Sequence, residues 1–155
     1  MGYVSFTNRR RLEGDPEVIW RAFTHPLETA QYEDHQTETV LGPDFDMVAG
    51  HSWDNKHGEE CDFDVVRWTI TRHVPNEVFE FTGKQRGIRQ NVVLTMEPAD
   101  RGHILTETIH FRPAIDGKLG TQLLSWLLLS TGLLAKVGND HGENLDLLEK
   151  YIATG

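Results

Sequence analysis

Five polar residues of this chain fall at positions where they could meet a bound molecule: His51, Gln90, Glu107, Ser130 and His141. Each is spaced with apolar neighbours along an expected strand or helix. A carboxylate or an imidazole in such surroundings can move a proton, and an amide or a hydroxyl can orient a polar group. A mostly apolar pocket with a few convergent polar groups is the usual form of a small-molecule site.

Glu107 is the best candidate for chemistry, because it alternates with Leu105 and Ile109 and would share their face of a strand. A carboxylate on an apolar face costs several kcal/mol unless it is paired or neutral. Two interpretations follow, a structural ion pair with an arginine or a catalytic group kept in an apolar site. The other four have local alternatives: a backbone bond at the rim for His51, local satisfaction for Gln90 and Ser130, and solvation for His141.

The apolar walls of such a site are predicted from strand alternation and helix spacing. The candidate ligand-binding side chains, besides the polar ones, are Trp53, Val66, Trp68, Phe79, Phe81, Leu94, Leu105 and Ile109 on strands, with Trp126, Leu127 and Leu134 on a terminal helix. A single bulge would invert the facing of one strand.

Motifs for other chemistry are missing from the sequence. The stretch "HSWDNKHGEECD" (51–62) is rich in potential metal ligands, but it has neither an H-E-x-x-H pattern nor paired cysteines. The sequence contains no glycine-rich phosphate loop, dinucleotide fingerprint or Ser-His-Asp signature. We therefore expect no metal and no cofactor, and Cys61, as the single cysteine, can form no intrachain disulfide.

Composition and charge narrow the class of protein. A net charge of −9 disfavours non-specific nucleic-acid binding, which depends on neutralising phosphates. The most apolar run, "LLSWLLLSTGLL" (123–134), has 12 residues, whereas a membrane-spanning helix needs about 20. We expect a soluble, cytoplasmic protein with a single domain over residues 1–155.

The pattern of elements predicts an α+β fold with seven antiparallel strands. A strand is expected at 3–12, followed by two short helices that begin at Pro16 and Pro26, with Asp15 as the N-cap of the first. Six strands joined by short turns should follow as a meander, at 37–41, 46–54, 61–74, 77–83, 88–97 and 103–111.

Residues 118–152 are helical in character, with glycines that allow a kink or a break. The run 123–134 is apolar almost all round, so one face must cover the sheet and another needs a second partner. Three partners remain open: the short helix near residue 27, a second copy of the chain in a homodimer, or a bound lipid-like ligand.

Four stretches resemble a known superfamily: "DPEVIWRAFTHPL", "AGHSW", "HVPNEVFEF" and "PADRGHILTETI". Together with the element order they resemble the START/SRPBCC (helix-grip) superfamily, in its polyketide cyclase/dehydrase-like branch. The resemblance covers nearly the whole chain. It implies a curved sheet wrapped around the long C-terminal helix, with an apolar cavity between them.

Three functions are compatible with that resemblance. The first is binding of a small hydrophobic molecule, lipid-like or cyclic, in the cavity. The second is a polyketide cyclase or dehydratase-like enzyme in the same cavity, with Glu107 as the proton-transfer group. The third is a protein-interaction module of the chaperone-activator type, in which the apolar helix surface meets another protein.

Overall fold

The computed structural model describes residues 4–33, 36–57, 64–85, 88–113 and 133–154 of the 155-residue chain. Its sheet has seven strands in the order β1-β7-β6-β5-β4-β3-β2, and every neighbouring pair is antiparallel. The strands are β1 Val4–Leu12, β2 Gln36–Leu41, β3 Ser52–His57, β4 Asp64–Val74, β5 Val78–Gln85, β6 Ile88–Pro98 and β7 His103–Pro113. The predicted fold class is thus confirmed, with a meander from β2 to β7 and with β1 added beside β7.

Two short helices connect β1 to β2: α1, Pro16–Thr24, and α2, Pro26–Tyr32. The Asp15 side chain accepts a hydrogen bond from the backbone N–H of Glu17 at 2.9 Å, as expected of an N-cap. His25 ends α1 and begins α2, and its Nδ1 accepts from the backbone N–H of Leu27 at 3.2 Å. A single residue therefore caps both helices and fixes the bend between them.

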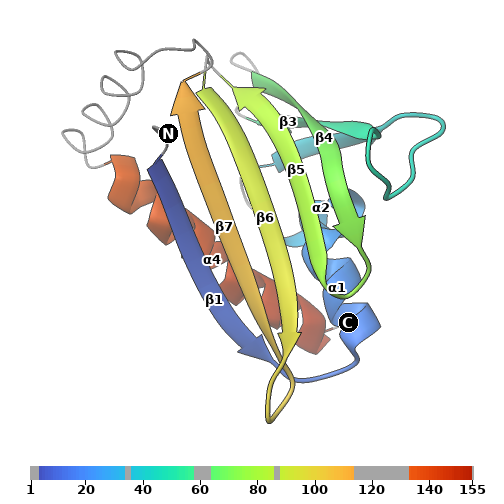
Figure 1. Ribbon diagram of the computed structural model, residues 1–155, viewed down its shortest axis with the longest axis vertical. Helices are drawn as coiled ribbons and strands as arrows, with labels where there is room; N and C mark the ends of the chain where they lie inside the picture. Colours follow the sequence, from blue (N-terminus) through green and yellow to red (C-terminus); the bar gives the residue numbers. More distant parts are fainter. Residues whose placement is uncertain (1–3, 34–35, 58–63, 86–87, 114–132, 155) are drawn as a thin grey trace.

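The C-terminal helix α4 spans Leu133–Thr154 and lies with α1 and α2 on one side of the sheet, crossing behind β1 and β7 (Figure 1). Leu145 and Leu148 of this helix are buried in the core. Arg10 of β1 donates to Glu149 at 2.8 Å and also to Asp146, so charged groups tie the edge strand to the helix. Among the described residues, no helix is both long and apolar enough to cross a membrane.

The structure corrects the bounds expected for the second strand of the meander. The strand expected at 46–54 begins only at Ser52 and continues to His57, because Gly50 has a φ of +94° and residues 47–50 form a bend followed by a turn. The terminal helix is described from Leu133 onward. The earlier part of the run 123–134 lies outside the described residues.

Candidate ligand-binding face

The face of the sheet that the helices cover carries the side chains that alternation predicted. We call it the concave face, since the sheet curves around the helices. Seven of the predicted side chains are buried there: Trp53, Val66, Trp68, Phe79, Leu94, Leu105 and Ile109. Phe81, Gln90 and Glu107 are half-buried. These residues share one face, and their role in binding stays a prediction.

Five rings form an aromatic cluster at one end of this face: Phe45, Trp53, Trp68, Phe79 and Phe81. Phe81 is central, with ring centroids 5.1–5.2 Å from those of Phe79, Trp53 and Trp68. Phe45 comes from the loop between β2 and β3 and meets Trp53 edge-on at 6.2 Å. Because no strand pattern includes Phe45, nothing in the sequence indicated that it belongs to the cluster.

Gly83 makes room for one of these rings. Trp68 lies opposite Trp53 in the β3–β4 register, and its six-membered ring passes over Gly83 on β5. A Cβ atom at Gly83 would lie 2.6 Å from Cε3 of Trp68, closer than two such carbons approach. The absence of a side chain at this position is therefore what allows the indole to lie flat against the strand.

Trp53 carries an unsatisfied polar atom inside the cluster. Its side chain is 4% exposed, and its Nε1 has no hydrogen-bond acceptor among the described residues. Most buried polar groups in folded proteins are hydrogen-bonded, and a buried donor without a partner costs about 1–3 kcal/mol.

His73 reaches the concave face because β4 contains a bulge. The register shifts between Ile70 and Arg72, which turns Arg72 outward and brings His73 opposite Phe79. The ring of His73 packs edge-on against Phe79 at 5.3 Å. Simple alternation from Trp68 and Ile70 would have put Arg72 inside instead, so the sequence analysis missed His73.

Glu107 lies on β7 between Asn8 of β1 and Leu94 of β6. Tyr32 of α2 is an ionisable group that feels the charge of Glu107 and that the sequence analysis missed, and its hydroxyl donates to the carbonyl of Ala22 at 2.9 Å. Burial raises the pKa of Tyr32 well above 10, and the negative charges of Glu33 and Glu107 raise it further. Tyr32 is therefore a neutral hydroxyl near Glu107 at any physiological pH.

Of the remaining predicted site residues, only His51 has a described side chain. Its Nδ1 accepts from the backbone N–H of Asp46 at 3.1 Å, as in the local alternative, and its ring meets Phe45 of the aromatic cluster edge-on at 6.3 Å. Trp126, Leu127 and Ser130 lie outside the described residues. Leu134 and His141 lie in the first half of α4, residues 133–142, where only the backbone is described. Within the described ranges, no three His, Cys, Asp or Glu side chains cluster as metal ligands would.

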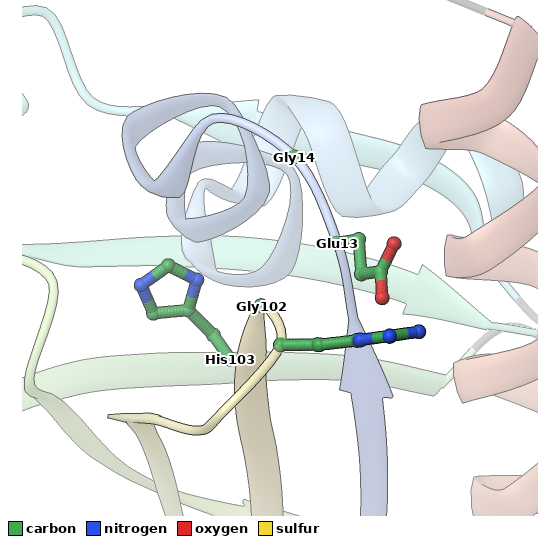
Figure 2. A pocket seen from close by; sticks show the side chains of 5 residues that line it. Glu13, Gly14, Gly102 and His103 are labelled. Carbon is green, nitrogen blue, oxygen red and sulfur yellow. The ribbon is translucent and has the colours of Figure 1, made fainter.

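A shallow depression of about 520 Å³ lies at the end of β1, lined by Glu13, Gly14, Arg101, Gly102 and His103. Figure 2 shows the side chains of Glu13 and His103 pointing away from each other. The turn between β6 and β7 lies in close contact with the end of β1, because a Cβ at Gly102 would overlap the carbonyl oxygen of Leu12. Glu13 and His103 of this depression do not point toward a common centre, so the concave face is the better candidate site.

Comparison with known families identifies the chain. The model of the family described as Activator of Hsp90 ATPase homolog 1-like protein matches residues 13–121, which is more than two thirds of the sequence. The chain belongs to this family. The match confirms the resemblance to the START/SRPBCC superfamily. No curated protein matches the chain in sequence.

Solved structures similar to this member of the Activator of Hsp90 ATPase homolog 1-like family share its fold at low identity. Ara h 8.0201 is 13% identical with a TM-score of 0.71, covering 99% of this chain and 100% of its own. TTHA0849 from Thermus thermophilus is 12% identical with a TM-score of 0.71, covering 97% and 98%. The di-domain ARO/CYC StfQ of the steffimycin biosynthetic pathway is 15% identical with a TM-score of 0.71, covering 98% of this chain and 51% of its own. These likenesses establish the helix-grip scaffold.

Proposed function

We propose that this protein binds a small hydrophobic ligand between the concave face of its sheet and the C-terminal helix. The ligand would be lipid-like or cyclic and would lie against the aromatic cluster. The scaffold, shared with Ara h 8.0201 and with the ARO/CYC protein StfQ, supports a binding or cyclase-like role.

One observation carries the proposal. The concave face combines the aromatic cluster with the half-buried polar side chains of Gln90 and Glu107, which lie among buried apolar neighbours on β6 and β7. A polar side chain on such a face costs free energy unless the protein or a ligand supplies its hydrogen bonds. A ligand site uses a few of them to orient its ligand.

The test uses two adjacent residues of β6 that face opposite sides of the sheet. Val92 is buried on the concave face, whereas Val93 pairs with Glu80 and Thr108 on the other face. If a cavity adjoins Val92, Val92→Phe should fill part of it, leave the melting temperature nearly unchanged and weaken binding of 1-anilinonaphthalene-8-sulfonate. The matched control Val93→Phe should bind the dye as the unaltered protein does.

The opposite outcome is equally clear. A tightly packed core would react to the larger ring with a loss of about 1–3 kcal/mol in stability. Such a loss in Val92→Phe, together with unchanged or absent dye binding, would contradict the proposed ligand site.

A second candidate function is a polyketide cyclase or dehydratase-like activity that uses Glu107. It is favoured by the position of this carboxylate between buried Leu105 and Ile109, with the neutral hydroxyl of Tyr32 nearby. The carboxylate would take a proton from a carbon between two carbonyl groups of a bound chain. That carbon would then attack a ketone of the same chain, whose oxygen would receive a proton as the ring closes.

Glu107→Gln tests this activity, because it keeps the shape of the side chain and removes the charge. With a poly-β-ketone thioester as substrate, loss of a general base should slow cyclisation about 100-fold or more. An unchanged rate would assign Glu107 to the scaffold and leave the binding function as it stands.

A further inference from the structure

Trp53 offers a buried hydrogen-bond donor in the aromatic cluster. The indole Nε1 is enclosed, with no acceptor among the described residues, and the side chain is 4% exposed. The ring is held by three neighbours: Phe79 stacks on it at 6.2 Å, Phe81 is tilted against it at 5.2 Å, and Phe45 meets it edge-on at 6.2 Å. With the backbone fixed in β3 between β2 and β4, the indole has little freedom to turn toward another partner.

The rings around Trp53 cannot satisfy this donor well. They carry no oxygen or nitrogen acceptor, and an N–H directed at a ring face is a weak and second-order interaction. A buried donor without a partner lowers stability by about 1–3 kcal/mol. The donor is therefore best explained by an acceptor that arrives with a bound molecule.

We infer that Trp53 Nε1 donates a hydrogen bond to an oxygen of the ligand, and that the ligand is a planar or fused-ring compound bearing a carbonyl or phenolic oxygen. This inference rests on the proposed function and specifies its ligand class. The aromatic rings favour a flat ring system through offset or edge-to-face contacts. The N–H selects for the oxygen, because a compound that lacks it leaves the donor unpaired. An unbranched saturated chain satisfies neither requirement.

The alternative acceptor for this N–H is an internal water, since buried waters satisfy such donors in many proteins. A water would make the same hydrogen bond in every complex, and it would give no preference for an oxygen on the ligand. The two alternatives therefore differ in how binding responds to a single oxygen atom, which is what the experiment measures.

The experiment is a cycle of two ligands and two proteins. 1-Tetralone and tetralin have the same fused rings and differ by one ketone oxygen, and Trp53→Phe keeps an aromatic ring while removing the N–H. Affinities are measured by isothermal titration calorimetry, because its signal does not depend on tryptophan. Comparing the ratios cancels the difference in hydrophobicity between the ligands and the loss of ring area in the variant.

Trp53→Phe should weaken 1-tetralone about 5- to 10-fold more than it weakens tetralin, as the loss of one hydrogen bond predicts. The matched control is Trp68→Phe, the same replacement at the register partner of Trp53, which should weaken both ligands by the same factor. Equal weakening of both ligands by Trp53→Phe would overturn the inference and leave the proposed function intact. Failure of the unaltered protein to bind either compound would overturn both.

A second measurement covers the case in which Trp53→Phe does not fold. In the unaltered protein labelled with ¹⁵N, the indole N–H proton of Trp53 should move downfield when 1-tetralone is added and stay in place with tetralin. The resonance is assigned through its short distances to the protons of Phe45 and Phe81. An identical response to both compounds would contradict a hydrogen bond to the ketone.

Discussion

Trp20 donates its indole N–H to Nε2 of His73 at 3.2 Å, with the planes of the two rings nearly parallel at 4°. Since Nε2 accepts, the proton of the neutral imidazole must be on Nδ1, which lies 2.5 Å from the carbonyl oxygen of Met47 and donates to it. One imidazole therefore links α1, β4 and the loop before β3. That loop also carries Phe45, so this link helps to hold the aromatic cluster in place.

His73→Phe should destabilise the protein by about 1–3 kcal/mol, because it leaves the N–H of Trp20 and the carbonyl of Met47 without their partner. Urea unfolding followed by circular dichroism measures the loss. Thr71→Ala, an exposed position two residues earlier on β4, is the control and should change stability by less than about 0.5 kcal/mol. Equal effects of the two replacements would mean that the imidazole bonds contribute little.

Gly83→Ala should cost about 1–3 kcal/mol, since its Cβ would meet the indole of Trp68 at 2.6 Å and force the ring away. The same replacement made in a Trp68→Leu background should cost far less, because the obstructing ring is gone. Gly42→Ala serves as a control, as a Cβ there meets nothing within 4 Å. Additive effects of Gly83→Ala and Trp68→Leu in chemical denaturation would contradict this explanation.

His25 should make stability depend on pH near neutrality. Burial lowers the pKa of His25 below 6.5, the charge of Arg21 lowers it further, and Glu28 opposes both. The unfolded chain then binds the proton more readily, so this contribution to stability is full above about pH 6.5 and is lost as the pH falls below it. Protonation also removes the Nδ1 acceptor for the N–H of Leu27.

His25→Asn separates the two functions of this residue. Asparagine is a good N-cap that does not titrate, so the variant should keep α2 capped. The drop in melting temperature between about pH 7.5 and about pH 5.5 should be smaller in the variant than in the unaltered protein. The other histidines titrate in both proteins, and an identical drop in both would assign the pH dependence to them.

Tyr151→Phe should reduce stability by about 1 kcal/mol near neutral pH, because the hydroxyl of Tyr151 donates to the carboxylate of Glu28 and thereby ties α4 to α2. The ring contact with Tyr32, at 5.3 Å, is kept by phenylalanine. The hydrogen bond to Glu28 raises the pKa of Tyr151 above 10, with a smaller contribution from burial. The contribution of this hydrogen bond to stability is therefore present below about pH 10 and is lost as the pH rises through the raised pKa of Tyr151. A difference between the two proteins that persists in strong alkali would rule out the hydroxyl as its source.

Much of the fold could be predicted because it depends on local patterns. Alternation identified the buried faces of β5, β6 and β7, and Asp15 with Pro16 marked the start of α1 correctly. Short turns implied the antiparallel meander, since consecutive strands joined in this way pair with each other.

The contacts that the sequence could not predict depend on backbone irregularities and on approach through space. The bulge of β4 turned His73 inward, and no residue type announces a bulge at that point. The sequence predicted that residues 46–50 belong to a strand. The positive φ of Gly50 is incompatible with a strand, so His51 lies in the loop before β3. The influence of Glu107 on the pKa of Tyr32 links residues that are far apart in sequence, so no local pattern could predict it.

The place of β1 in the sheet has a consequence for how the chain reaches its native state. Thr7 of β1 and Thr108 of β7 pair directly on neighbouring strands although they are 101 positions apart in the sequence. Because β1 precedes β7 in the chain, it must wait without its native partner until β7 has been synthesised. Because such distant pairing requires closing a very large loop, it slows folding. During that interval the arginines at positions 9–11 keep the waiting strand charged, which discourages it from pairing with other chains.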